Sequence, residues 1–475
     1  MKYFKNIPDR PLTNWLIMLV MATAIMMLLS RDSYLYLLGP RCDSACFFMC
    51  GKAWMNGMVP YVDFADSKGP LLWLIYGVGY LLSHYDYHGV FWVSVIVYSF
   101  TFYFLFKTAR IFVNHRSQAL LAVLMTSVFI FNPITHNETR AEDFCNFFTA
   151  LSLWQLFKLL YGEHIGHSTL KAFFLFGVSI GGTLLIKYNI TAMCCIFPAI
   201  GLYHTIRNHN SILRPIITCA AGFFTITTPF IIYLLLQESF TSFIQEYFIN
   251  TLQTIENNKV YYGVRNITLF TLVLAISILP LSYKLKNYKW VPLIIYAAYV
   301  FTTLYSAKFG YYFSILNIFT IFPTTVLSLI ARSFWKTTLS STLVILSLFT
   351  AYNIFVLPGS LWDEINKKEI KEVTEIFNLV SKPKVVVTDL DNGYGITSGS
   401  LPACKYWMLQ NGHLPTMYEN ILDCILKKRC DFAVIYERRF RVHDLQRKMK
   451  ELGYNLVYTY NDGGEVFKAP NRTQP

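Results

Sequence analysis

The sequence predicts an α-helical polytopic membrane protein of about eleven transmembrane helices, followed by a small extracytoplasmic α/β domain. The chain of 475 residues is 54% hydrophobic and 15% charged, and apolar runs of transmembrane length recur from Asn14 to Pro358. A soluble domain of this size could not bury so many runs, so a bilayer must surround them. The runs are continuous rather than alternating, which indicates helices instead of the strands of a closed barrel.

The apolar runs define a predicted membrane domain over residues 1–358. Spans are predicted at 13–30, 90–106, 117–134, 144–161, 171–186, 190–206, 215–236, 266–283, 290–306, 311–331 and 338–357. A cytoplasmic amino terminus, marked by Lys2, Lys5 and Arg10, leaves the basic residues of nearly every later turn on the cytoplasmic side. This satisfies the positive-inside rule. The first run lacks a small-x-small cleavage site, so we expect a retained span and not a signal peptide.

Acidic residues are distributed in the opposite way, with most of them on the outer side. Of the thirteen Asp and Glu residues before position 358, only Asp9 and Glu163 fall on the cytoplasmic side. Longer outer loops would explain this distribution, and so would a polar site on the outer side. The net charge of +13 is accounted for by membrane topology, so we expect no nucleic-acid partner.

Residues 359–475 form the predicted second domain, which lies outside if eleven spans precede it. Helices are predicted at 362–380, 402–411, 418–428 and 441–452, and strands at 384–388 and 432–436. This alternation predicts a small α/β domain. The ten cysteines show no metal-type spacing, but Cys424 and Cys430 could form a disulfide in an oxidising outer compartment.

The first outer loop, residues 31–89, is long for a connection and is expected to be structured or functional. Asp43 follows the first span among apolar neighbours. Such a carboxylate could have a raised pKa and act as a general base. The alternative is an acid that caps the following helix.

A second polar stretch, residues 57–70, contains prolines and glycines that fix turns. These turns would present four polar residues at the membrane surface: Tyr61, Asp63, Asp66 and Lys68. Lys68 suits a lipid phosphate, with Asp66 as its partner or as a second acid. The alternative is a lysine that merely snorkels.

The following apolar segment, residues 70–83, is too short to span a bilayer. Fourteen residues make roughly 21 Å of helix, against a hydrocarbon core of about 30 Å. We expect it to lie in the interface or to dip in and return.

The second outer loop ends in Arg140, Glu142 and Asp143. Paired carboxylates could hold a divalent cation, with Asp43, Glu142 and Asp143 as candidate ligands. Alternatively, neighbouring carboxyl groups could shift each other's pKa, so that one acts as an acid and the other as a base. The alternative is a helix start, where acids favour the helix dipole.

Two cations, Lys187 and Lys308, stand at outer span ends and are candidates for binding a lipid phosphate. The alternative is that both lysines only extend their ammonium groups to the membrane surface and bind no ligand. The outer segment 237–265 mixes charged and aromatic residues and could be an amphipathic interfacial helix on the acceptor side.

The first loop resembles that of GT-C-type glycosyltransferases, nearest the bacterial protein O-mannosyltransferase and lipid A aminoarabinose transferase group. The matching positions are Asp43, Gly51, Trp54, Gly57, Pro60, Tyr61, Asp66, Lys68 and Pro70. The resemblance implies that Asp43 is the catalytic base and that Asp66 and Lys68 lie near the lipid phosphate. Gly69 stands where the family has Pro, and Asp66 is one residue further from Lys68 than in the family.

The resemblance extends beyond this loop. Relatives also carry an Arg and an acid after their third span, matched by Arg140 and Glu142, and a basic-aromatic entry to a late span, matched at Lys308. The tail loop from Tyr394 to Tyr406 resembles a loop of bacterial members, where acceptor or lipid contacts are expected.

The predicted activity is inverting transfer of a hexose or pentose from a polyprenyl-phosphate donor at the periplasmic face of the inner membrane. The acceptor would be a lipid, a glycan or a protein. Asp43, Asp66 and Glu142 are the predicted catalytic residues; Lys68, Arg140, Lys187, Lys308 and Tyr61 are the predicted donor-binding residues. No nucleotide-binding glycine loop supports a nucleotide-sugar donor.

Two other functions fit a polytopic envelope protein. A lipid-linked glycan flippase would carry polar or broken spans at mid-bilayer, whereas polarity here gathers at the outer ends of the spans. An outer-face glycan polymerase would have a large late loop, whereas the large loop here is the first.

Overall fold

The computed structural model describes residues 10–36, 43–133, 138–161, 167–256, 288–306, 310–331, 334–356, 364–388, 393–408, 415–436, 445–461 and 463–470. Its contacts divide the chain into two compact units. The first comprises residues 1–30, 94–231 and 258–356, and the second comprises residues 31–93, 232–257 and 357–475. Each unit is therefore assembled from segments that are far apart in the sequence.

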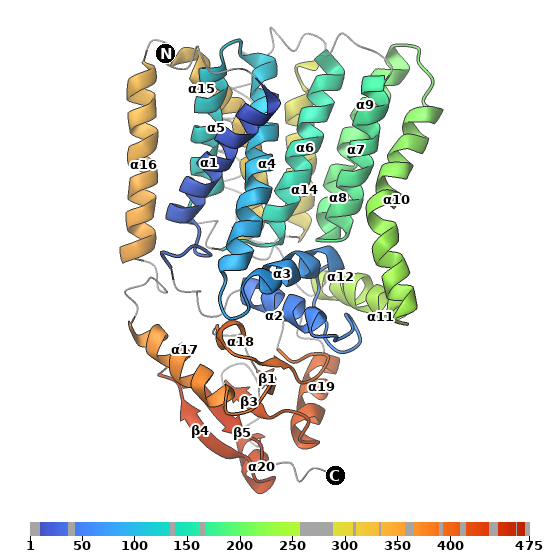
Figure 1. Ribbon diagram of the computed structural model, residues 1–475. Coiled ribbons are helices and arrows are strands. Elements are labelled where there is room, and N and C mark those ends of the chain that lie inside the picture. Colours follow the sequence, from blue (N-terminus) through green and yellow to red (C-terminus); the bar gives the residue numbers. More distant parts are fainter. Residues whose placement is uncertain are drawn as a thin grey trace. The chain divides into compact units, whose positions relative to one another are not determined.

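The first unit is a bundle of apolar helices (Figure 1). It contains α1 (Pro11–Leu29), most of α4 (His88–Phe112), α5 (Arg116–Ile130), α6 (Ala141–Tyr161), α7 (His167–Leu184), α8 (Tyr188–Cys194), α9 (Ile196–Arg207), most of α10 (Leu213–Leu236), α14 (Val291–Ser306), the 3₁₀ helix η4 (Gly310–Thr320), α15 (Ile321–Ile330) and α16 (Trp335–Phe355). Within the described ranges, five stretches are long and apolar enough to cross a membrane: α1, α4, α8 with α9, α10 and α16. Several shorter apolar helices accompany them.

The predicted spans fall on these helices, except for 266–283, which lies outside the described residues. Two spans are less regular than predicted. The span at 190–206 divides into α8 and α9, and the span at 311–331 begins as η4 before it becomes α15.

Close helix packing in this unit depends on small residues, as is usual in lipid, where the hydrophobic effect does not hold helices together. A Cβ on Gly177 would lie 1.8 Å from the Cys219 carbonyl oxygen, and one on Gly222 would lie 2.0 Å from that of Phe174. Glycine therefore lets α7 and α10 touch along their backbones. Hydroxyl pairs add polar contacts, such as the 2.8 Å hydrogen bond between Thr126 on α5 and Thr324 on α15.

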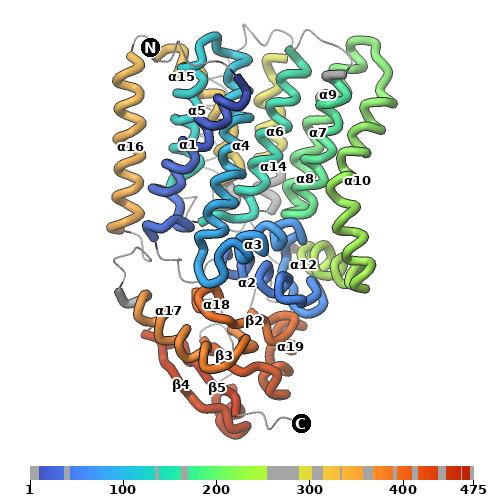
Figure 2. Tube along the Cα trace, viewed as in Figure 1, coloured from blue at the N-terminus to red at the C-terminus, as the bar shows by residue number. Residues whose placement is uncertain are grey.

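The second unit joins three stretches of chain, shown in blue, green and orange-red in Figure 2. The first stretch carries α2 (Asp43–Met55) and α3 (Pro70–Leu82). The second carries α11 (Phe240–Phe243), the π-helical turn η2 (Ile244–Ile249) and α12 (Asn250–Glu256). The third is the tail. The predicted interfacial segment 70–83 is thus a helix of thirteen residues, and the described part of 237–265 is helical after Ser239.

The tail contains a five-stranded mixed sheet with the order β2-β1-β3-β5-β4. Its elements are α17 (Glu364–Phe377), β1 (Lys384–Val387), α18 (Tyr394–Thr397), β2 (Leu401–Pro402), α19 (Pro415–Leu426), β3 (Phe432–Ile435), α20 (Leu445–Glu451), β4 (Asn455–Thr459) and β5 (Glu465–Lys468). β1 pairs in parallel with β2 and β3, while β5 pairs antiparallel with β3 and β4.

The sequence prediction of the tail needs two corrections. The helix predicted at 402–411 is wrong over its described part, because Leu401 and Pro402 pair with β1 and residues 403–408 form no helix. The hairpin of β4 and β5 was not predicted, although Gly463, with φ of 88°, marks its turn. Cys424 and Cys430 are buried free thiols and form no disulfide here.

Candidate active site

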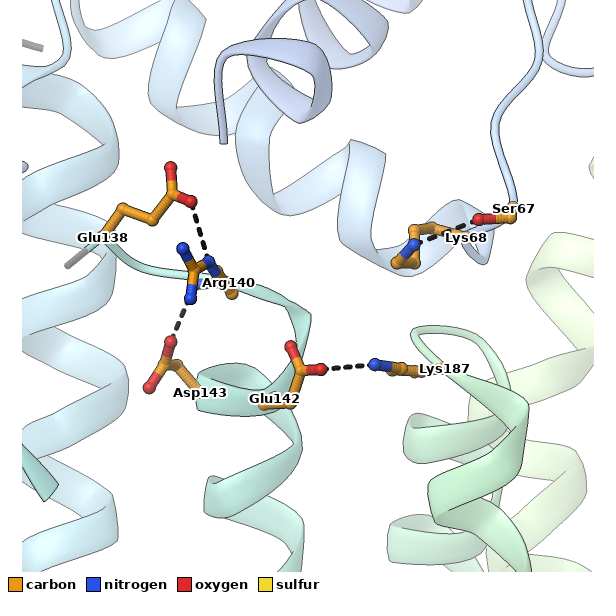
Figure 3. A network of polar contacts seen from close by, with 7 residues as sticks. All are labelled: Ser67, Lys68, Glu138, Arg140, Glu142, Asp143 and Lys187. Carbon is orange, nitrogen blue, oxygen red and sulfur yellow. Dashed lines mark hydrogen bonds and ion pairs between the residues drawn. The ribbon is translucent and has the colours of Figure 1, made fainter. Parts of the chain in front are cut away.

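The acids predicted at the end of the second outer loop lie at the start of α6 (Figure 3). α6 begins at Ala141, so Glu142 and Asp143 occupy its first turn, where the helix dipole stabilises negative charge. The alternative interpretation of these acids, a helix start, is therefore confirmed. Both are buried, with 3% of each residue exposed, so each needs a partner.

Asp143 and Arg140 close the amino-terminal end of α6. The Arg140 backbone N–H donates a 2.7 Å hydrogen bond to Asp143 Oδ2, and the Tyr98 hydroxyl donates one to Asp143 Oδ1. The Arg140 side chain lies between two carboxylates in Figure 3, and its Nε is 2.7 Å from Glu138 Oε1. Asp143, the third residue of α6, thus bonds back to the backbone of the residue before the helix, as the acid of a capping box does.

Glu142 forms an ion pair with Lys187, which directly precedes α8. Their side chains are 4% and 12% exposed, so both charges are largely removed from water. Burial of either charge alone would be costly, and the pair persists because each compensates the other. Two residues predicted from separate stretches of sequence are thus brought together.

In the second unit, the acid and lysine of the first loop lie just before α3. Asp66 Oδ1 accepts a 2.6 Å hydrogen bond from the Ser67 backbone N–H. Lys68 Nζ donates a 3.1 Å bond to Ser67 Oγ, as Figure 3 shows. Asp66 is only 7% exposed, and its buried Oδ2 has no hydrogen-bond partner among the described residues. A buried carboxylate oxygen without a partner costs free energy, and such groups are typical of binding sites.

α2 brings the predicted base toward the same loop. Asp43 is in the first turn of α2, and Lys68 Nζ lies 5.5 Å from the centre of the Phe47 ring. A hydrogen bond with Cys50 raises the pKa of Cys46 well above its ordinary value, and burial and the charges of Asp66 and Asp43 raise it further. The charges of both carboxylates therefore act on one thiol of α2.

Tyr61 supports this loop from inside. The residue is fully buried, and its hydroxyl donates a 2.9 Å hydrogen bond to the Lys68 carbonyl oxygen. Its φ of 68° is unusual for a residue with a Cβ, and its ring packs 4.5 Å from that of Trp73. Burial raises the pKa of the Tyr61 hydroxyl, which keeps it protonated as a donor.

The structure adds two residues that were not predicted from the sequence. One predicted residue lies outside the described part of the chain. Lys308 is not among the described residues. Tyr98, which holds Asp143, sits inside an apolar span, and its need for a hydroxyl partner was the available signal. Ser67 stands between Asp66 and Lys68 in sequence and also in the hydrogen-bond chain.

The predicted divalent cation finds little support in the described side chains. Within the described ranges, no group of three or more His, Cys, Asp and Glu residues could hold a metal ion. Glu142 is ion-paired with Lys187, and Asp143 accepts hydrogen bonds at both oxygens. These two candidates do not fit a cation site as they stand.

Residues 67–233 match the family described as dolichyl-phosphate-mannose-protein mannosyltransferase. This region contains Lys68, Arg140, Glu142 and Lys187. The match covers 167 of the 475 residues. The predicted resemblance to the protein O-mannosyltransferase group is confirmed by this match. The chain is a multi-pass membrane protein.

A solved structure supports the fold of this chain. ArnT from Cupriavidus metallidurans, solved bound to undecaprenyl phosphate, is similar with a TM-score of 0.61 at 10% identity, covering 97% of this chain and 100% of that chain. The archaeal oligosaccharyltransferase AglB from Archaeoglobus fulgidus, solved with an inhibitory peptide and a dolichol-phosphate, has a TM-score of 0.48 at 10% identity, covering 98% of this chain and 75% of that chain. A search of curated proteins found no match.

Proposed function

We propose that the protein transfers a sugar from a polyprenyl-phosphate donor to a hydroxyl of a lipid, glycan or protein acceptor, with inversion at the sugar. The observation that carries this proposal is the buried ion pair of Glu142 with Lys187, which lies within the region matched to the mannosyltransferase family. Buried charges at the ends of apolar helices are expensive and point to function. ArnT, the similar solved protein, is described as bound to undecaprenyl phosphate.

The proposed mechanism assigns a base and a set of cations. Asp43 accepts the proton of the acceptor hydroxyl as that oxygen attacks the sugar carbon, and the bond from this carbon to the lipid phosphate breaks. Lys68 stabilises the departing phosphate, together with Arg140, Lys187 or Lys308. Electrostatic stabilisation of the leaving group is the main expected catalytic effect.

Asp66 and Glu142 have distinct proposed roles. Asp66 orients the acceptor or Lys68 through its unpartnered Oδ2. Glu142 holds the Lys187 ammonium in place through their ion pair. The positive charge of Lys187 is therefore already positioned when the donor binds. No step of this mechanism depends on a metal ion.

We further propose the topology predicted from sequence: eleven spans within residues 1–358, a cytoplasmic amino terminus, and a periplasmic domain at 359–475. Its support is the composition of the second unit. Three stretches predicted to be periplasmic, namely the first loop, residues 237–256 and the tail, pack together in that unit. Contacts such as the 2.6 Å ion pair of Lys405 with Glu246 require a common side of the membrane.

The test is transfer by the purified full-length protein in lipid nanodiscs, with a panel of radiolabelled polyprenyl-phosphate sugars and a lipid or peptide acceptor mixture. We expect turnover with at least one donor, and little change on adding a chelator, because Glu142 and Asp143 are already partnered. Asp43→Asn should reduce transfer about 10²-fold or more. Full activity of D43N with normal expression would contradict the assignment of the base.

The rival is a flippase, and the same preparation separates the two functions. Reconstituted vesicles carrying a fluorescent polyprenyl-phosphate sugar would show donor movement without any new glycosidic bond if the protein were a transporter. That outcome, with no transfer to any acceptor, would overturn the proposed enzyme.

A further inference from the structure

The tail is joined to the loop that carries Asp66 by a direct backbone contact. The Ala65 N–H donates a 2.9 Å hydrogen bond to the Lys405 carbonyl oxygen. Ala65 is 1% exposed and belongs to the hydrophobic core of the tail, where it packs with Tyr406, Met417 and Ile421 among others. One residue of the first loop is thus part of a core whose other members follow it by more than three hundred positions.

Glu246, on the π-helical turn η2, holds the same stretch of tail from a third segment. Its carboxylate lies 2.6 Å from Lys405 Nζ and accepts hydrogen bonds from the Tyr406 hydroxyl at 2.6 Å and from Asn250 Nδ2 at 2.8 Å. Only 6% of Glu246 is exposed. One buried carboxylate with a cation and two donors is a well-compensated charge that fixes its neighbours firmly.

A second contact ties the beginning of the same tail stretch to α2. Lys52 is 2% exposed, and its Nζ donates hydrogen bonds to the carbonyl oxygens of Gly395 at 2.9 Å and Ser398 at 2.6 Å. These carbonyls belong to the short helix α18 and its end, where a positive charge is favourable. The tail loop that resembles one of bacterial members therefore has intramolecular partners at both ends.

We propose that tail residues 394–406 position the Asp66-Ser67-Lys68 loop, with Tyr406 and Lys405 as positioning residues that act through Glu246 and Ala65. Ala65 directly precedes Asp66, so any movement of the tail loop moves that carboxylate. Displacement of a reacting group by 1 Å can cost on the order of 10²-fold in rate. The catalytic consequence rests on the proposed glycosyl transfer, whereas the positioning itself does not.

The test compares two tyrosines that each donate to a glutamate. Tyr406→Phe removes the hydrogen bond to Glu246, and the matched control Tyr458→Phe removes the 2.8 Å bond to Glu372 inside the tail. Both variants are measured in the full-length protein by hydrogen–deuterium exchange of peptides covering residues 60–70. We expect about tenfold faster exchange there in Y406F only, since a hydrogen bond to a charged group contributes about that factor.

Transfer kinetics give the second readout. Y406F should lower kcat about tenfold with little change in the donor KM, because the loop is misplaced and not removed. Glu246→Gln removes the charge that pairs with Lys405 and weakens the hydrogen bond from Tyr406, so exchange at 60–70 should be at least as fast as in Y406F.

The exchange experiment decides the inference even if no donor is ever found. Equal exchange at 60–70 in wild type and Y406F would overturn the proposal, and so would equal acceleration in Y406F and Y458F. Faster exchange in Y406F without any transferase activity in wild type would leave the positioning intact and contradict the proposed function instead.

Discussion

Two acidic regions of the molecule differ in how their carboxylates are satisfied. At the start of α6, Glu142 is ion-paired with Lys187, and Asp143 accepts hydrogen bonds from Tyr98 and the Arg140 backbone. Before α3, Asp66 is also buried, yet its Oδ2 has no partner among the described residues.

The difference distinguishes carboxylates that stabilise the local structure, Glu142 and Asp143, from a carboxylate that can bind a ligand, Asp66. A buried carboxylate depends on its partners, and removing one of them is costly. A carboxylate oxygen without a partner costs stability, and a bound hydroxyl or cation would satisfy it. Substitutions at the start of α6 should therefore lower stability, whereas substitution of Asp66 should lower activity without lowering stability.

The largest effect is expected from Lys187→Met, which leaves Glu142 buried without its cation. Removing one member of a buried pair costs about 3–5 kcal/mol, so we expect a clear fall in Tm of the detergent-purified protein and loss of transfer. Lys427→Met is the control, since it removes an exposed 2.7 Å pair with Asp423 and should barely change the Tm. A K187M protein as stable as K427M would show that the pair does not compensate Glu142.

The second-largest effect is expected from a direct comparison of Asp66 with Asp143. Asp66→Asn should leave the Tm unchanged or slightly higher, because it removes an unsatisfied buried charge, while transfer falls about 10²-fold. Asp143→Asn should lower the Tm by weakening hydrogen bonds to a charged group, each contributing about 1.5–3 kcal/mol. Thermal denaturation and kinetics of both variants are the measurements, and a D66N enzyme with full activity would remove Asp66 from the mechanism.

The smallest effect is expected from Tyr61→Phe, which removes the hydroxyl that holds the Lys68 carbonyl. One neutral hydrogen bond contributes about 1 kcal/mol, so the Tm should fall slightly and the donor KM should rise about fivefold. Tyr85→Phe, at an exposed tyrosine of the same loop, is the control and should behave like wild type. No change in donor KM for Y61F would mean that Lys68 keeps its place without Tyr61.

Much of the first unit could be predicted because lipid imposes one rule on every span. Apolar runs had to be helices, and charged residues such as Glu142 and Lys187 had to fall near span ends, where the structure pairs them. The sequence could indicate that the Tyr98 hydroxyl needs a partner, but nothing in an apolar run reveals that this partner is Asp143.

The second unit was harder to predict, since its contacts join distant positions. Lys52 and Gly395 are 343 residues apart, and neither carries a pattern that points to the other. In the tail, strand-like runs at β1 and β3 were recognised from their apolar residues. β4 was not, since its residues are mostly exposed and its pattern resembles a loop.

The π-helical turn at Ile244–Ile249 carries one residue more than an α-helix needs at that point. The extra residue is taken up within a single turn, so the helix direction on either side of it is kept. Deleting one residue there would restore ordinary α geometry and leave α12 close to its present orientation relative to α11. Homologous chains without this residue would then differ mainly in the side chains that the turn presents, of which Glu246 is one.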